Sequence, residues 1–246
     1  MSSIKQLFTQ SLVYGLSTVV PRLLNYFLVP LYTRIFIPQD YGIITEMYAY
    51  LGFFLVLLTF GLETGFFKFA SKYESIDKVY PTAFYFLLSS SIIASTIFIL
   101  FSVNIASLLG KIYHPYYIVV LGLVISIDAL TAITFAKLRY LNKALLFSSI
   151  KIIGVVVNLV LNILFLVYLP NTTSFLFIKN IDLIGWVFIS NLVSSLLTLI
   201  LVLFVTGIPK IKINQKIFKE LMIYSLPLLL AGLGGTTNET FDRIFI

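Results

Sequence analysis

Two charged residues of opposite sign lie deep inside long apolar stretches of this sequence. Arg22 stands near the middle of the segment from Leu12 to Phe36, and Asp128 stands inside the segment 116–136. At 1.5 Å per residue along a helix, both lie roughly 15–18 Å from the ends of their segments. A guanidinium binds phosphate oxygens two at a time, and a carboxylate holds a proton or a cation. Anion binding and ion coupling are therefore the two kinds of chemistry that these residues offer.

A charge at the centre of a bilayer costs roughly 2.5–3.5 kcal/mol, so it normally faces a partner or a watery cavity. Two interpretations of Arg22 stay open. In the first, Arg22 faces a central cavity and attracts a pyrophosphate or an acidic sugar. In the second, Arg22 and Asp128 only neutralise each other inside a helical bundle. The first is favoured, because charges within a membrane generally mark function.

Four asparagines are also placed deep in apolar segments. Asn158 and Asn162 are one helical turn apart and so share a face, and Asn25 and Asn191 have similar depth. These amides either line a polar path for sugar hydroxyls or hydrogen-bond neighbouring helices. Asn25, Asn158 and Asn162 are accordingly candidates for a substrate cavity, together with Arg22 and Asp128.

Glu63 lies inside the pattern Gly61-x-x-x-Gly65 at the end of the second apolar segment. Its carboxylate is a candidate site for a coupling proton or cation, as is that of Asp128. The alternative, which is favoured for Glu63, is a packing motif in which the glycines let two helices approach closely. Nearer the outer segment ends, Glu46 and Arg34 are expected to form an interfacial ion pair.

The composition indicates which elements position these residues. Hydrophobic residues make up 59% of the chain and charged residues 11%, whereas a soluble domain has about 25% charged residues. The protein is therefore predicted to be a helical membrane protein. The net charge of +7 falls between the apolar segments, so we expect no nucleic acid partner.

Few residues could support catalysis or hold a prosthetic group. The chain has no cysteine and a single histidine, His114, and no glycine-rich phosphate loop of the Walker type. We therefore expect no catalytic residues, no metal site and no cofactor, and we do not expect an enzyme.

The predicted fold class is all-α, a polytopic transmembrane helical bundle with six complete spans and the start of a seventh. The six spans are about residues 10–33, 43–67, 81–104, 116–136, 146–169 and 183–206, and the seventh starts near Leu221. We expect residues 1–206 to form an N-terminal six-helix lobe. Residues 207–220 would be a basic cytoplasmic linker between lobes, and 221–246 the start of a truncated second lobe.

Lysine and arginine follow a strict alternation between the connectors. The connectors after spans 2, 4 and 6 hold Lys68, Lys72, Lys78, Lys137, Arg139, Lys143, Lys210, Lys212, Lys216 and Lys219, with Lys151 close by. The other connectors hold only Arg34, Lys111 and Lys179. The positive-inside rule then places the N-terminus in the cytoplasm.

A short repeat joins the two ends of the chain. Thr33-Arg-Ile-Phe-Ile37 returns as Asp242-Arg-Ile-Phe-Ile246, six spans later and hence in the same orientation. A parallel internal repeat requires this geometry, so the pattern suggests two six-helix lobes.

Several local motifs resemble those of a known transporter family. They are Pro30-Leu-Tyr-Thr-Arg34, Pro38-Gln-Asp-Tyr-Gly42, the stretch 61–70, and Tyr224-Ser-Leu-Pro-Leu followed by Asp242-Arg243. In this order they resemble the polysaccharide biosynthesis, or oligosaccharide-lipid flippase, family. That family is related to multidrug and toxin extrusion transporters and lipid II flippases.

The resemblance implies two lobes around a central cavity and movement of undecaprenyl-linked sugars across the bacterial inner membrane by alternating access. The implied partners are a lipid-linked oligosaccharide of the undecaprenyl-pyrophosphate type, membrane lipids, and H⁺ or Na⁺. The product would feed surface polysaccharide such as O-antigen, capsule or exopolysaccharide.

Two alternatives stay open. A cation-coupled multidrug efflux transporter of the related family would prefer an anionic cavity, and Arg22 argues for an anionic substrate instead. A membrane subunit or enzyme of polysaccharide synthesis would usually have a large external loop, whereas the longest external connector here is only about 13 residues, 170–182.

Overall fold

The computed structural model describes residues 15, 19–21, 23–110, 112–171 and 181–244, with side chains as far as Thr236 apart from that of residue 171. Within these ranges all regular elements are helical. Six helices are long and apolar enough to cross a membrane: Pro38–Lys72, Ile76–Leu100, Pro115–Tyr140, Ala144–Tyr168, Leu183–Thr206 and Gln215–Thr236. The prediction of an all-α, multi-pass membrane protein is confirmed.

The spans predicted second to seventh each have a counterpart in this set. They are α3 (Pro38–Thr59) with α4 (Leu62–Lys72), α5 (Ile76–Leu100), α7 (Pro115–Tyr140), α8 (Ala144–Ile163), α9 (Leu183–Thr206) and α10 (Gln215–Ile244). Two short helices accompany them, α2 (Leu28–Ile35) and α6 (Ser102–Leu109), and a π-helical turn, Leu164–Tyr168, extends α8. Much of the first predicted span, including Arg22, lies outside the described residues.

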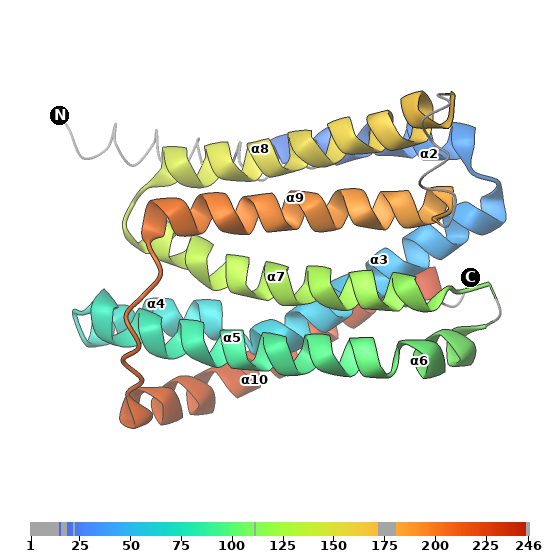
Figure 1. Ribbon diagram of the computed structural model, residues 1–246. Helices are drawn as coiled ribbons and strands as arrows, with labels where there is room; N and C mark the ends of the chain where they lie inside the picture. The colour runs from blue at the N-terminus through green and yellow to red at the C-terminus, as the bar shows by residue number, and fades with distance from the viewer. Residues whose placement is uncertain (1–14, 16–18, 22, 111, 172–180, 245–246) are drawn as a thin grey trace.

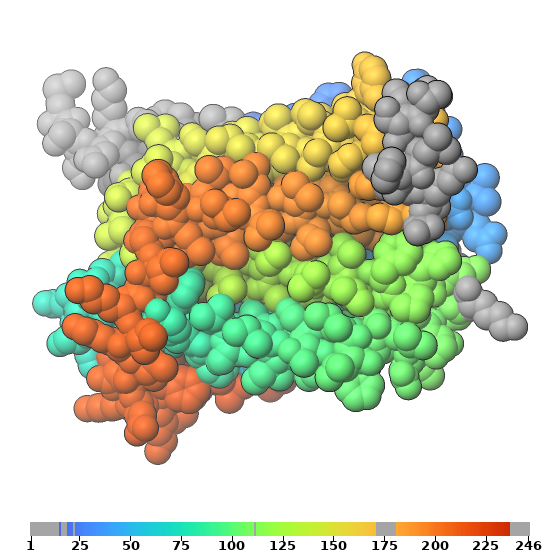
Figure 2. Space-filling model, viewed as in Figure 1, coloured from blue at the N-terminus to red at the C-terminus, as the bar shows by residue number. Residues whose placement is uncertain are grey.

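The long helices lie side by side with α7 near the middle (Figure 1). α7 packs between α5 and α9 and is the most buried of the spanning helices, while α8 packs on the far side of α9. α10 packs against α3 and α4. The side chains of α5, α7, α9 and α8 form one continuous face in Figure 2, so the interior of the bundle lies behind that face.

Small residues explain the close contact of α7 with α5. A Cβ added to Gly122 would overlap the side chain of Phe98, and Ser126 Oγ donates to the carbonyl oxygen of Ser91 at 3.1 Å. Ser95 donates a hydrogen bond of 2.7 Å to the same Ser126 hydroxyl. Between helices in a membrane, such close backbone approach and hydroxyl bonds replace the hydrophobic effect as the source of association.

One end of the bundle collects the basic side chains and is called the basic end here; it is on the left in Figure 1. It comprises Lys68, Lys72, Lys78, Lys137, Arg139, Lys143, Lys151, Lys210, Lys212, Lys216 and Lys219. The linker from α9 to α10 crosses this end and is tied to the bundle. Tyr85 Oη donates to the Pro209 carbonyl at 2.7 Å, and Thr82 Oγ1 accepts from the Asn214 backbone N–H at 3.2 Å.

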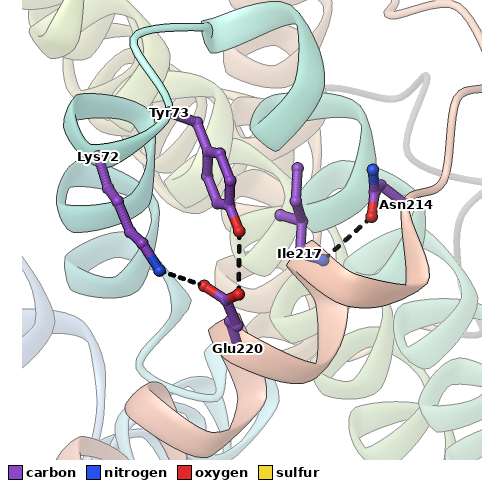
Figure 3. Close-up of polar contacts among 5 residues, drawn as sticks. All are labelled: Lys72, Tyr73, Asn214, Ile217 and Glu220. Carbon is purple, nitrogen blue, oxygen red and sulfur yellow. Dashed lines mark hydrogen bonds and ion pairs between the residues drawn. The ribbon is translucent and has the colours of Figure 1, made fainter.

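α10 begins at Gln215, earlier than the start near Leu221 that the hydropathy indicated. The cause is a helix cap at Asn214, whose Oδ1 accepts from the backbone N–H group of Lys216 at 3.0 Å and from that of Ile217 at 3.1 Å. Figure 3 shows the bond from Ile217. A capping asparagine satisfies N–H groups that a helix start otherwise leaves unpaired. The first turns of α10 are therefore helical although their residues are polar, which is why hydropathy alone did not include them.

At the opposite end, two carboxylates accept hydrogen bonds from tyrosines. Glu46 accepts from Tyr50 at 2.9 Å and from Tyr113. The ion pairs among the described residues are Lys72–Glu220 and Arg139–Glu63, so the expected pair of Glu46 with Arg34 is wrong. Burial, and then the bond to Glu46, raise the pKa of the Tyr113 phenol. The phenol therefore stays protonated, and remains a donor, at neutral pH.

Asp182 combines several bonds at the start of α9. Its side chain accepts from the Gly185 backbone N–H at 2.8 Å, as a helix cap, and from the hydroxyls of Tyr116 and Tyr117 on α7. We expect Asp182→Ala to lower the free energy of unfolding by about 1–2 kcal/mol, because it removes the cap and two acceptor bonds. Thermal unfolding in detergent measures this as a lower Tm.

Asp40→Ala is the matched control for this prediction. Asp40 is an acidic residue in the first turn of α3 at the same end, but α3 has no side-chain cap bond, whereas Asp182 is the N-cap of α9. Its loss should change the free energy of unfolding by less than about 0.5 kcal/mol. Equal effects of the two substitutions would contradict the role of Asp182.

Candidate functional site

Two adjoining cavities lie within the bundle. The first has a volume of about 430 Å³ and is lined by α4, α7, α8 and α9, with Asn25 and Leu55. The second has a volume of about 470 Å³ and is lined mainly by α2 and α3. Four polar residues line both cavities: Asn25, Asp128, Asn158 and Asn191. We call these four residues the polar girdle, since they stand where one cavity passes into the other.

The first cavity extends from the polar girdle toward the basic end. α7 contributes Asp128 at the girdle and Arg139 near the end of the helix, eleven residues or about 16 Å further along. α8 contributes Lys151 and Asn158, two turns apart on one face.

α9 completes the wall of the first cavity with a single polar stripe. Asn191, Ser194, Ser195 and Thr198 follow the spacing i, i+3, i+4 and i+7, which keeps them on one side of the helix. Ser194 Oγ also donates to the Gly154 carbonyl at 2.6 Å. The stripe therefore both lines the cavity and holds α8 against α9.

The second cavity extends from the polar girdle toward the opposite end. Tyr41, Thr45 and Tyr48 from α3 and Tyr32 from α2 contribute its polar atoms. Apart from these residues and the polar girdle, its wall is apolar: Leu28, Val29, Ile44 and Leu51. Together the two cavities offer hydroxyl and amide groups over much of the depth of the bundle.

Asn162, in contrast, lines neither cavity. It is fully buried, and its Oδ1 accepts from the Tyr32 hydroxyl at 2.9 Å. Its Nδ2 donates to the backbone oxygen of Asn158 at 2.8 Å and to Asn158 Oδ1 at 3.0 Å. The amide thus joins α2 to α8 and orients the girdle residue Asn158. For Asn162, the structure therefore agrees with the second interpretation given above, a hydrogen bond between neighbouring helices.

Glu63 lies where the first cavity reaches the surface near the basic end. It forms an ion pair with Arg139, and the two side chains are 38% and 35% exposed respectively. The glycines on either side of it pack against α10: a Cβ on Gly61 would meet the Ser225 carbonyl oxygen at 2.9 Å, and one on Gly65 would overlap the Ser225 side chain. These contacts agree with the interpretation of Gly61-x-x-x-Gly65 as a packing motif. The Glu63 carboxylate itself lines the first cavity.

The structure therefore brings together Asn25, Asp128 and Asn158 of the predicted cavity residues, and adds Asn191. Arg22 lies outside the described residues, so its pairing with Asp128 stays a prediction. Sequence reasoning missed Arg139 and Lys151 as cavity residues, because their positions near connectors already had an explanation in membrane orientation. Their spacing to Asp128 and Asn158, three turns and two turns on the same helices, is the signal that could have found them.

This geometry defines a class of protein: a multi-pass helical membrane protein with polar cavities that run through much of the bundle. The chain belongs to the polysaccharide biosynthesis protein family, whose family model matches residues 31–246. No curated protein and no solved structure matches the chain. The matched region contains the cavity lining except Asn25, Leu28 and Val29. The resemblance noted in the sequence is confirmed, and with it a role in polysaccharide biosynthesis.

Proposed function

We propose that this protein acts in a flippase that moves an oligosaccharide linked to undecaprenyl pyrophosphate across the bacterial inner membrane. The single observation that carries the proposal is the polar girdle, where four polar side chains, of which Asn25 is exposed, join two cavities of a membrane bundle. A multi-pass membrane protein that belongs to a polysaccharide biosynthesis family needs a polar path through its bundle only if polar material crosses the bilayer.

The chemistry of the lining matches that substrate in two respects. Amides and hydroxyls donate to and accept from sugar hydroxyls without a net charge. Arg139 and Lys151, at the basic end of the first cavity, suit the phosphate groups of the lipid carrier. In this proposal the basic end faces the cytoplasm, as the distribution of lysine and arginine favours.

The proposal assigns transport and no covalent chemistry to the chain. Movement would be driven by H⁺ or Na⁺, and Asp128 is the favoured site for the ion because it belongs to the polar girdle. Glu63, the other candidate, is engaged with Arg139.

Deletion of the gene tests the proposal. We expect surface polysaccharide to be lost and lipid-linked oligosaccharide to accumulate on the cytoplasmic leaflet, where an added impermeant glycosidase cannot reach it in intact cells. The wild-type gene should restore both, and Asp128→Ala should restore neither. Normal polysaccharide with raised sensitivity to cationic drugs would instead indicate an efflux transporter. Single repeat units already exposed on the outer leaflet would indicate a synthesis enzyme.

A further inference from the structure

α4 is set off from α3 by a break in the backbone. Phe60 and Gly61 both have left-handed conformations, with φ of 51° and 64°. Residues other than glycine seldom adopt positive φ, so the chain changes direction here at a cost that the surrounding packing must offset.

α10 has its own break beside this one. Pro227 lies inside the helix, where its ring removes the hydrogen bond to the carbonyl four residues earlier. The two breaks touch: a Cβ on Gly61 would lie 2.9 Å from the Ser225 carbonyl oxygen and 3.2 Å from the Leu229 nitrogen. The backbone breaks of these two neighbouring helices therefore lie at the same level of the bundle.

Between these breaks and the basic end, α4 is fastened to the first half of α10. Glu220 accepts from Lys72 Nζ at 2.6 Å and from Tyr73 Oη at 3.0 Å (Figure 3). Lys68 Nζ lies 3.7 Å from the centre of the Tyr224 ring. We call residues 62–73 with 215–226 the α4–α10 arm, since these contacts bind them into one unit.

The arm packs against α5 and α7: its Phe66 and Leu221 are buried in one apolar cluster with Tyr80 and Ile133, and the Phe66 ring contacts the ring of Tyr140. The ion pair of Glu63 with Arg139, at the end of the first cavity, adds a polar contact between the arm and α7. The guanidinium has five N–H donors, and its buried Nε has no hydrogen-bond partner among the described residues. Lys151 lines the same cavity. A phosphate or pyrophosphate carries more charge than one carboxylate and accepts two parallel bonds from a guanidinium, so it competes with Glu63.

We propose that Arg139 is a phosphate-binding residue restrained by Glu63, and that a phosphate group which replaces Glu63 weakens the contact of α4 with α7, so that the α4–α10 arm moves away from α7 more often by bending at its two breaks. The inference rests on the proposed function for the source of the phosphate, namely the lipid carrier. It adds the residue that receives the phosphate and the part of the fold that responds.

Disulfide formation between paired cysteines tests the proposal, because the chain has no cysteine of its own. The pair Phe67→Cys with Tyr140→Cys reports on the contact of α4 with α7, where the two rings lie 6.4 Å apart. The pair Lys68→Cys with Tyr224→Cys reports on a contact inside the arm and serves as the control for folding. The probe is inorganic pyrophosphate added to the purified full-length protein, compared with sodium chloride of equal ionic strength.

We expect pyrophosphate to slow disulfide formation across α4 and α7 by about 1.4- to 5-fold, the range set by a partly exposed ion pair. Formation inside the arm should not change. Glu63→Gln should slow the α4–α7 disulfide to a similar extent without pyrophosphate. Arg139→Gln should slow it too and abolish the response to pyrophosphate, whereas the exchanged pair Glu63→Arg with Arg139→Glu should restore fast formation.

An unchanged α4–α7 rate with pyrophosphate, or an equal response in Arg139→Gln, would overturn the proposal. A change at both cysteine pairs would also overturn it, since the arm would then not move as one unit. The proposed function is tested separately by the gene deletion. A pyrophosphate response together with normal surface polysaccharide leaves the inference standing and removes the flippase; the reverse result removes the inference alone.

Discussion

Asn158→Trp is expected to reduce the export of lipid-linked oligosaccharide to less than about a tenth of the wild-type rate. Asn158 lines both cavities, so an indole at this position fills the passage between them. A steric penalty of about 1.4 kcal/mol on passage of the substrate is enough to lower the rate about tenfold. The measurement is recovery of surface polysaccharide in the deletion strain, with the amount of protein in the membrane determined in parallel.

Ile153→Trp is the matched control for this substitution. Ile153 lies on the same helix, is 44% exposed, and lines neither cavity. A tryptophan there faces the lipid and should leave export close to the wild-type rate. Full export with Asn158→Trp at normal protein levels would show that substrate does not pass the polar girdle, and the proposed path would be wrong.

The polar girdle shows how far sequence reasoning reaches in a membrane protein. Asn25, Asp128, Asn158 and Asn191 could be selected because a polar group in an apolar span is costly and therefore has a reason to be there. Depth along each span then placed them at one level. The sequence does not say which way each helix is rotated, and Asn162 illustrates the consequence. It shares a face with Asn158, but it is fully buried, bonds the hydroxyl of Tyr32 and lines neither cavity.

The α4–α10 arm shows what the sequence leaves open. The hydropathy predicted one continuous span over 43–67, and the left-handed conformation of Phe60 that interrupts it depends on its tertiary surroundings. The sequence also does not show which helix packs against this break. All sides of a spanning helix are apolar, so periodicity does not separate the lipid-facing side from the packed side. Only the small residues Gly61 and Gly65 indicated a contact, and they did not indicate that α10 supplies it.

Asn162→Leu is expected to lower the free energy of unfolding by about 1–3 kcal/mol, the cost of leaving buried hydrogen-bonding groups without partners. The substitution keeps the branched shape of the side chain but removes the acceptor for Tyr32 and both donated bonds to Asn158. Thermal unfolding in detergent measures the loss, and Asn104→Leu, at an exposed asparagine of α6, is the control that should have little effect.

A double-mutant cycle with Tyr32→Phe separates the bond from the burial of the amide. If the hydroxyl of Tyr32 and Oδ1 of Asn162 interact as their 2.9 Å separation indicates, the two substitutions should be less than additive by about 0.5–1.5 kcal/mol. Additive effects would mean that α2 is held to α8 by other contacts. Because Asn162 also orients Asn158, Asn162→Leu should reduce export more than its loss of stability accounts for. Tyr32→Phe should leave the Asn162–Asn158 bonds and most export in place, which assigns the additional loss to the polar girdle.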